Sequence, residues 1–576
     1  MRLLPLPPPA RPWTLVTLAA LLLATSGAAP PAAPRASDLP AIVFVSRQPV
    51  PGDPRAIPGL GPHQRALATG GRLLVRERDG RVREVLGRDA LFDVSDPSVS
   101  PDGRRIAFAG TVARDSAWRL WVVGVDGGGL APVTRGSERF DDLDPCWLDD
   151  STLVFASTRY PQRAEYADLP VTNLFTVCVA RDPGRACPPR RVTAERNGAE
   201  EPAVDWRSGR ILFARWWFNR HRAADTPAGI TTDPAAAIAR DTVNLWQVMS
   251  MSRSDRRLHL AGGDLRARRG TMGYQPCVLA DGSLAAVYAA NLGLSPRPGG
   301  VGIHLLSRGF GAEHRLAGAL VSARAGDVYG GTEGLAPPAA CAPAGLPDGR
   351  VLFAYDPGAR GDLGLYVMRA DGSRIERLLD LPGTLELDPA PVVVRRAPPP
   401  TPPPALDERE DPDATNATRA AGHEPMDEIA PAETPAFELR GFPPSPATFR
   451  FHDLDVFADG PPGSAARGAA ARTPGARIRF YATLSRPEAA GGDSAFLVRE
   501  APVGGNGEVN EKGLPAEVPM FEQLVGRDGR VLMTAHGPAH VAGFNAGVAG
   551  TVARCVGCHL GHSTLPIPTG STGGGR

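Results

Sequence analysis

The stretch "SDPSVSPDGRRIAFAG", Ser95 to Gly110, places a Pro-Asp-Gly turn between two short strand-like segments. An Asp-Gly pair flanked by apolar residues is a strong signal for a β-hairpin. The same form, a polar residue, a proline, a short strand, a tight turn and a second strand, recurs along the chain. It recurs at Leu143–Thr158, Glu200–Arg215, Tyr274–Ala289 and Ala340–Tyr355, and a shorter copy, "LDPAPVVVRR", ends at Arg396. Recurrence of one such unit is typical of a repeat architecture.

Between these copies lie further hairpins, such as "RLWVVGVDGGGLAPVT" and "GLYVMRADGSRIERLL", in which apolar and polar residues alternate. Each unit therefore predicts a four-stranded antiparallel sheet, which buries both faces only when similar sheets stack around an axis. We expect an all-β chain whose residues 37–396 form a six-bladed β-propeller. The opening strand Ala41–Arg47 should pair into the last blade and close the ring. A β-sandwich would have similar strand spacing, but the repeated Pro…Asp-Gly signature favours the propeller, and it resembles the blades of TolB-like propellers.

The propeller segment carries no hydrolase or metalloprotease signature, because neither Gly-x-Ser-x-Gly nor His-Glu-x-x-His occurs. The blade acids Asp96, Asp144 and Asp149 are expected to cap turns and to accept hydrogen bonds from backbone amides. Cys146 and Cys277 each follow a blade proline and are expected to be small buried residues, although either could reach a metal at a domain interface.

The N-terminus has the pattern of a secretory signal peptide. Arg2 and Arg11 precede a short apolar segment, Trp13 to Ala24, and small residues offer a cleavage site near residue 29. We therefore expect residues 1–29 to be removed and the mature chain to be exported, for example to the periplasm, without spanning the membrane. The net charge of +1 argues against nucleic-acid binding, which requires a basic excess.

Cysteines in an exported chain meet an oxidising compartment. Cys178 and Cys187 flank the turn-forming sequence Asp-Pro-Gly, so a disulfide across that hairpin is expected. The chain has seven cysteines, and an odd number leaves at least one without an internal disulfide partner.

A Pro-rich, acidic segment at residues 397–436 separates the propeller from a different C-terminal pattern and predicts an extended linker. Residues 437–576 predict a small β-rich domain, with strands at "ATFRFHDLDVFA", "ARIRFYATL", "SAFLVREAPV" and "RVLMTA". The segment "GLPAEVPMFEQLV", Gly513 to Val525, is interpreted as a Pro-rich crossing. A loop and a short helix are expected at the end of the domain.

The stretch "ARCVGCHLGHS", Ala553 to Ser563, contains a Cys-x-x-Cys-His motif. In c-type haem attachment, Cys555 and Cys558 on one helical turn add to the haem vinyl groups, and His559 ligates the iron. Such attachment is made outside the cytoplasm, in agreement with the predicted export. Two alternatives remain open: a zinc site that uses the same residues, and a redox-active disulfide.

The second axial ligand of such a haem has several candidates near the motif. Candidate residues are His562, His540 and His536. A second histidine gives a low-potential electron-transfer haem, whereas an open position gives a haem that binds ligands or catalyses a reaction.

The C-terminal residues "HVAGFNAGVAGTVARCVGCHLGHSTLP", together with the crossing segment and the propeller, resemble the α subunit of hydrazine synthase. The resemblance implies that Cys555 and Cys558 hold the haem. It also implies that a tyrosine four residues after the motif histidine ligates the iron, while that histidine turns to a zinc ligated by a propeller cysteine. Here Ser563 occupies the tyrosine position, which returns His559 or His562 to the iron, and the candidates for a zinc thiolate are Cys146, Cys277 and Cys341.

The sequence therefore predicts an exported c-type cytochrome-like protein with one covalent haem and a possible zinc. We expect electron transfer, or redox chemistry of small nitrogen compounds as a haem-dependent oxidoreductase, together with a redox partner protein or other subunits of a complex. The chain contains one Cys-x-x-Cys-His, whereas the resembling subunit has a further haem domain, so hydrazine synthesis by this chain alone is not expected. The alternative is a periplasmic propeller that acts as a binding or scaffold protein, with zinc or a disulfide at the motif.

Overall fold

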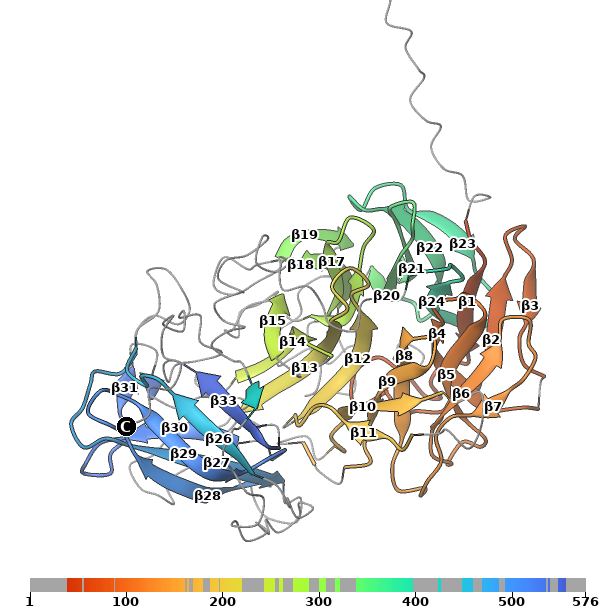
Figure 1. The fold of residues 1–576 in the computed structure, drawn as a ribbon. Coiled ribbons are helices and arrows are strands. Elements are labelled where there is room, and N and C mark those ends of the chain that lie inside the picture. The colour runs from red at the N-terminus through yellow and green to blue at the C-terminus, as the bar shows by residue number, and fades with distance from the viewer. Residues whose placement is uncertain are drawn as a thin grey trace, which may run out of the picture. The chain divides into compact units, whose positions relative to one another are not determined.

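The fold consists of β-strands in every part of the chain that the structure describes (Figure 1). The structure, a computed structural model, describes residues 39–53, 56–87, 89–160, 163–164, 169–179, 187–195, 197–219, 243–253, 258–262, 273–289, 300–306, 316–321, 338–396, 423–425, 448–458, 469–485, 493–518, 520–534, 537–538, 547 and 549–555. Among these residues, no helix is long and apolar enough to cross a membrane.

The repeat units form four-stranded antiparallel sheets, each built from consecutive strands. The first two consist of β4 (Asp93–Val99), β5 (Arg105–Thr111), β6 (Arg119–Gly124) and β7 (Ala131–Pro132), and of β8 (Asp142–Asp149), β9 (Thr152–Ser157), β10 (Asn173–Cys178) and β11 (Arg190–Arg191). The third consists of β12 (Gly198–Val204), β13 (Ile211–Asn219), β14 (Val243–Met251) and β15 (Leu258–Gly262). The next two consist of β16 (Tyr274–Val278), β17 (Leu284–Ala289), β18 (Val301–Leu306) and β19 (Leu316–Val321), and of β20 (Ala339–Gly345), β21 (Arg350–Asp356), β22 (Gly364–Arg369) and β23 (Glu376–Leu379).

The closing blade is shared between the two ends of the propeller sequence. It has the order β24 (Leu385–Pro391), β1 (Ile42–Arg47), β2 (Gly71–Arg76) and β3 (Val82–Glu84). The shorter last copy of the repeat therefore lies in the innermost strand, β24, and the N-terminal segment supplies the other three strands. This is the predicted closure of the ring by the opening strand. The innermost strands β4, β8, β12, β16, β20 and β24 contact one another in this order, and β24 contacts β4, so the ring closes. The predicted six-bladed propeller is confirmed.

Every innermost strand has a β-bulge at the residue before its proline. That residue has a positive φ, and the strand pairing shifts register there. The residues are Asp96 (φ 54°), Asp144 (50°), Glu201 (53°), Gln275 (46°), Ala342 (50°) and Asp388 (51°). Proline cannot donate to a sheet ladder, so it is tolerated at a bulge in a strand with a free edge.

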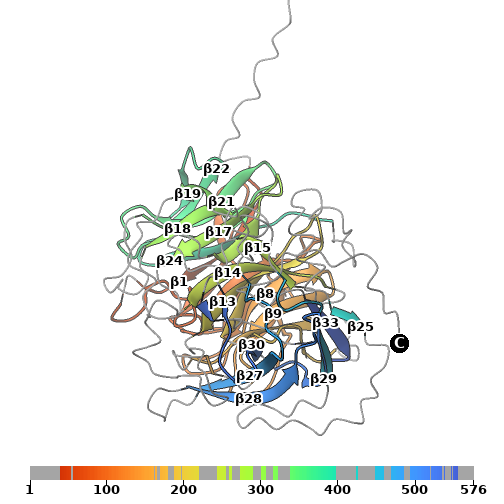
Figure 2. The ribbon, with the colours of Figure 1, turned by 90° about the vertical axis from the view of Figure 1, so that its left-hand side faces the viewer.

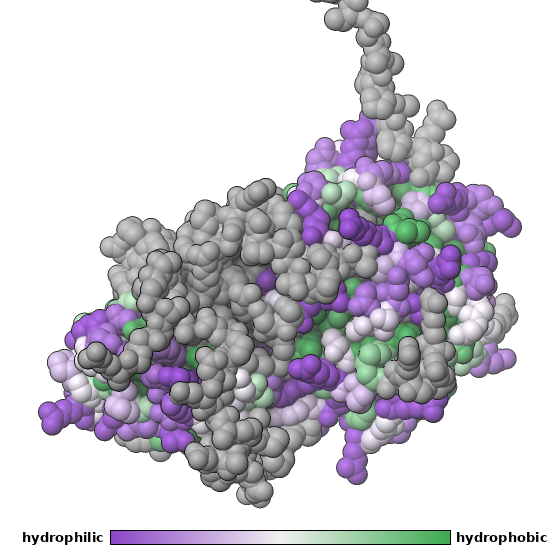
Figure 3. Space-filling view, viewed as in Figure 1, coloured by the Kyte–Doolittle hydropathy of each residue, from purple (hydrophilic) through white to green (hydrophobic). Residues whose placement is uncertain are grey.

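Buried apolar side chains fill the spaces between neighbouring blades, which explains why a single blade could not bury both of its faces. One cluster joins side chains from several blades, among them Val45, Phe108, Trp246 and Leu387. Hydrophilic residues alternate with scattered apolar ones over the outer face drawn in Figure 3.

The C-terminal part contains a second set of sheets with its own apolar core (Figure 2). One sheet has the order β25 (His423–Pro425), β33 (Thr551–Cys555), β26 (Thr448–Asp453) and β29 (Val509–Pro515), and another has β28 (Asp493–Pro502), β27 (Arg477–Ser485) and β30 (Met520–Val525). The short strands β31 (Met533–Thr534) and β32 (Gly537–Pro538) pair with each other. The core includes Phe451, Ile478, Phe480, Met520 and Leu524.

One sequence interpretation of this region was wrong. The segment interpreted as a Pro-rich crossing contains the end of β29 and all of β30, because Pro515 ends one strand and the apolar residues from Met520 form the next. The linker contributes β25, which pairs with β33. The signal peptide, the rest of the linker and the expected short helix lie outside the described residues.

Closure of the ring should make β1 a sensitive site for stability. Phe44 is fully buried, whereas Val82 in the same sheet is 36% exposed. We expect Phe44→Ala to lower the free energy of unfolding by about 3–5 kcal/mol, as for other large-to-small core substitutions. Val82→Ala, the matched control, should change it by less than about 1 kcal/mol. Urea unfolding followed by tryptophan fluorescence measures both, and equal effects would contradict this role of β1.

Candidate functional site

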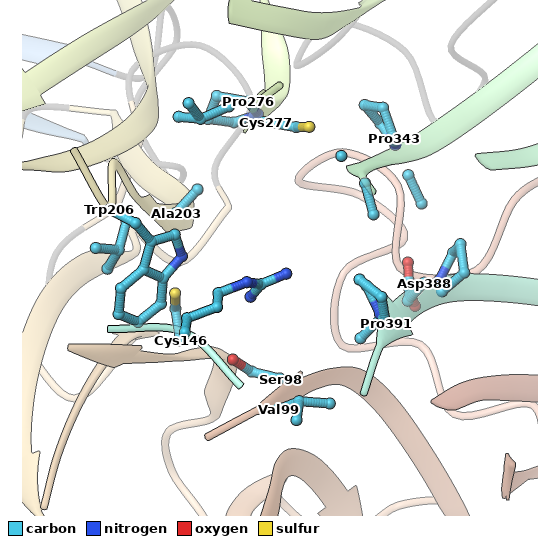
Figure 4. A pocket seen from close by; sticks show the side chains of 18 of the residues that line it. Ser98, Val99, Cys146, Ala203, Trp206, Pro276, Cys277, Pro343, Asp388 and Pro391 are labelled. Carbon is cyan, nitrogen blue, oxygen red and sulfur yellow. The ribbon is translucent and has the colours of Figure 1, made fainter. Parts of the chain in front are cut away.

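The innermost strands surround a pocket of about 510 Å³ on the propeller axis (Figure 4). Its wall repeats one pattern, because the residue before each blade proline and the residue after it both line the pocket. The bulge causes this, since it turns the residue with positive φ away from the ladder and towards the axis. The pocket therefore has successive layers of side chains, one residue from each blade in each layer.

The first layer, here called the acidic ring, is mostly carboxylate. Its members are Asp96, Asp144, Glu201, Gln275, Ala342 and Asp388. Oxygen atoms of Asp96, Asp144 and Glu201 lie within 4.8 Å of one another. Several members also join neighbouring blades: the backbone N–H of Glu201 donates to Asp144 Oδ2 at 3.0 Å, and that of Ala342 donates to Gln275 Oε1 at 2.9 Å.

Arg65 is the cation that binds the acidic ring. This residue lies in the loop between β1 and β2, and only 4% of its side chain is exposed. Its guanidinium donates hydrogen bonds to Asp144 and to the neighbouring Glu200, and Nη2 lies 3.7 Å from Glu201 Oε1. Glu200 also accepts a hydrogen bond of 2.7 Å from the Tyr274 hydroxyl.

The acidic ring and Glu200 together contain more carboxyl groups than the single guanidinium of Arg65 can neutralise. Burial and the neighbouring carboxyls raise the pKa of Asp96 and Glu201 well above its usual range, and burial raises the pKa of Asp388 to about 6. Burial also raises the pKa of Glu200 to about 7, against the opposing charge of Arg65. These carboxyl groups are therefore stabilised either by binding protons or by binding another positively charged group.

The second layer contains small side chains, which keeps the centre of the pocket open. It consists of Ser98, Cys146, Ala203, Cys277, Ala344 and Ala390. In Figure 4 the side chains of Cys146 and Cys277 lie on different sides of the open space. Burial raises the pKa of the Cys146 thiol to about 11 and of the Cys277 thiol to about 12, so both are protonated at neutral pH.

The end of the pocket away from the acidic ring carries a guanidinium. Arg395, four residues after β24, lines the pocket and lies over the Trp206 ring, with 5.8 Å from its Cζ to the ring centroid. Burial lowers its pKa, and the two thiols are the neighbouring titratable groups. No carboxylate among the described residues pairs with it.

Several predictions for propeller residues are borne out. Cys178 and Cys187 form the expected disulfide. Asp144 accepts a backbone amide hydrogen bond across blades, and Asp149 caps a turn by accepting the Ser151 N–H at 2.8 Å. Cys277 is buried, whereas Cys146 is only half-buried.

The predicted haem residues are outside the described residues, with one exception. Cys555 is the last residue of β33, which runs parallel to β26 so that Cys555 pairs in register with Asp453. The turn that follows Cys555 lies outside the described residues, so the expected helical turn between the two cysteines stays a prediction. Cys558, His559, His562, His540 and His536 are not described. Of the three candidates for a zinc thiolate, Cys341 lies in the inter-blade core, and Cys146 and Cys277 line the pocket.

Comparison with known proteins supports the fold. No family model matches the chain, and no curated protein matches it. Among solved structures, hydrazine synthase of Kuenenia stuttgartiensis is similar over 92% of this chain and 71% of that chain, with a TM-score of 0.63 and 14% sequence identity. TolB of Acinetobacter baumannii is similar over 62% of this chain and 67% of that chain, with a TM-score of 0.37 and 13% identity. At these identities the likeness to hydrazine synthase concerns the fold.

Sequence reasoning missed Arg65, Arg395 and the acidic ring as one site. The ring was visible as the residue before each blade proline, which is acidic in four of six copies. Arg65 lies in a segment without a repeat, and Arg395 lies at the end of the shortened last copy, where the other copies have no matching arginine, so no periodic signal marks either residue.

Removal of Arg65 should destabilise the protein in a pH-dependent way. We expect Arg65→Met to lower the free energy of unfolding by about 3–5 kcal/mol at pH 8, because it leaves buried carboxylates without their cation. The loss should be smaller at pH 5.5. A carboxyl whose pKa is raised by folding binds its proton more tightly in the folded state, so acidification relieves the repulsion.

Urea unfolding at the two pH values measures this difference. Arg72→Met, at an exposed position of β2, is the control and should change stability by less than about 0.5 kcal/mol at both. An equal loss for Arg65→Met at pH 5.5 and pH 8 would exclude electrostatic compensation as the role of Arg65.

Proposed function

We propose that this protein is an exported c-type haem protein, which transfers electrons or acts on small nitrogen compounds within a complex. The observation that carries the proposal is the Cys-x-x-Cys-His motif that begins at the end of β33. Its support is the likeness of the fold to hydrazine synthase over 92% of the chain.

The donor set of the motif fits covalent haem. Cys555 and Cys558 supply the thiols for two thioether bonds, and His559 supplies an imidazole for the iron. The iron would supply one-electron chemistry, with a potential set by the second ligand. The sheet pairing of β33 with β25 and β26 fixes the backbone up to the first thiol. A haem bonded to Cys555 would therefore be attached at the end of a paired strand.

Covalent attachment of haem to the motif requires that the chain be exported from the cytoplasm. The N-terminal sequence has the form of a cleaved signal peptide, and the Cys178–Cys187 disulfide is of the kind formed in oxidising compartments. Both features support a periplasmic location, where haem attachment and a redox partner are available.

The second ligand decides between electron transfer and catalysis. His562, His540 and His536 are the candidates, and Ser563 is too weak a ligand to take this role. A zinc ion is the second metal expected, and the propeller thiols that line a pocket and could ligate it are those of Cys146 and Cys277. Because both are protonated at neutral pH, a metal would have to displace their protons.

The first test is a pyridine haemochrome spectrum of the full chain, exported from a host with c-type maturation machinery. We expect a covalent c-type spectrum with one haem per chain. Cys555→Ala with Cys558→Ala should abolish it, and His559→Ala should alter the iron ligation. Cys277→Ser is the matched control and should retain the haem, because it removes a thiol outside the motif.

Absence of covalent haem from a folded wild-type chain would overturn this proposal. Zinc or free thiols at the motif would then favour a periplasmic propeller that binds or organises other molecules. If haem is present, shifts of its spectrum with added nitric oxide or hydroxylamine indicate an open position, and no shift indicates a six-coordinate electron-transfer haem.

A further inference from the structure

The axial pocket of the propeller has opposite charges at its two ends. The acidic ring lies at one end, and among the described residues two of its members, Asp96 and Asp388, have neither a hydrogen bond nor an ion pair with a guanidinium. The other end carries Arg395 beside Trp206. This arrangement is independent of the haem motif, and the proposed redox function does not use it.

The positive end is available to a ligand. Among the described residues, the Arg395 side chain has no hydrogen bond and no ion pair, and the groups that surround its charge are an indole and two neutral thiols. A planar guanidinium in such a place is suited to bind a carboxylate through two parallel hydrogen bonds. Since its own backbone N–H donates to Pro101 O at 2.8 Å, the residue is held at the turn end of the channel.

The negative end is suited to a group that donates several hydrogen bonds. Arg65 binds Asp144 and Glu200, whereas Asp96 and Asp388 line the pocket with only neutral hydrogen-bond donors, Ser95 and the Asp96 backbone N–H, beside them. Burial, and then repulsion by the negative charge of Asp388, raises the pKa of Asp96. An ammonium placed between them would relieve this repulsion and donate to carboxylate oxygens.

The distance between the ends sets the length of the ligand. The acidic ring and the layer of Cys146 and Cys277, next to Arg395, are two residues apart along the innermost strands, which corresponds to about 7 Å. An extended dipeptide has about the same span. The small side chains of the layer that contains Cys146 and Cys277 leave room for the ligand's side chains in a volume of about 510 Å³.

We propose that this pocket binds short peptides of two or three residues with free termini, with the ammonium at Asp96 and Asp388 and the carboxylate at Arg395. Recognition of both ends by charge selects against longer chains and against ligands with one charge. The side chains meet only small residues, so the site selects for the termini more than for the sequence.

The test is isothermal titration calorimetry of the full chain at pH 7.5 and low salt, with the dipeptide Ala-Ala as the probe. We expect saturable binding of one dipeptide per chain. N-acetyl-Ala-Ala and Ala-Ala-amide, each of which lacks one charge, should bind at least tenfold more weakly. Arg395→Gln should cause a similar loss, and Asp388→Asn should weaken binding of Ala-Ala while leaving that of N-acetyl-Ala-Ala unchanged. Arg396→Gln, an exposed neighbour, is the control and should bind as the wild type does.

Three results would overturn the proposal. The first is no binding of Ala-Ala by the folded chain. The second is equal binding of N-acetyl-Ala-Ala, which would assign Arg395 to simple anions. The third is tight binding of calcium that excludes Ala-Ala, which would assign the acidic ring to a cation alone. Circular dichroism of each variant establishes that it is folded, so a loss of binding by Arg395→Gln reports on the pocket.

Discussion

A residue with positive φ followed by a proline occupies the innermost strand of each blade, and the centre of the propeller depends on this constraint. For a residue other than glycine this conformation costs roughly 1–2 kcal/mol. The bulge that accommodates it directs one side chain per blade to the axis. Hydrogen bonds between successive blades, such as Glu201 N–H to Asp144, offset part of the cost. The same strain that opens the ladder thereby builds both the pocket and part of the contact between blades.

The propeller was predictable because its signals are local. Asp-Gly turns, prolines and period-2 alternation lie within a few residues of one another, and each repeats. The pairing of β1 with β24 followed from counting hairpins, since the first strand had no partner of its own. In the C-terminal part the signals conflict: Pro515 suggests a crossing, but the buried Met520 and Leu524 form a strand with the core behind it. There, burial against the core determines that these residues form a strand, and the pattern of turn residues does not indicate this.

The candidate site shows a different limit of sequence reasoning. Asp96 and Asp144 were expected to serve turns and backbone amides, and Asp144 does so. Their common direction towards the axis depends on the bulge, whose backbone conformation a residue pattern does not display. Arg395 reaches the pocket from the segment after β24, and Arg65 reaches the acidic ring from a loop. The haem motif is the opposite case: its chemistry is explicit in the sequence, while the described structure adds only the strand that leads to Cys555.

Closure of the ring through β24 and β1 also bears on the biogenesis of the chain. The hydrogen bond between Ser46 and Thr384 joins residues 338 positions apart, so the first strands must wait for almost the entire propeller to be made. Contacts of this separation form late, because loop closure must precede them. Until then β1 has an unpaired edge, which is a site for aggregation or for a chaperone. The ring thus makes folding conditional on a complete copy of the repeat array, and a chain truncated during synthesis would keep an exposed strand that quality control can recognise.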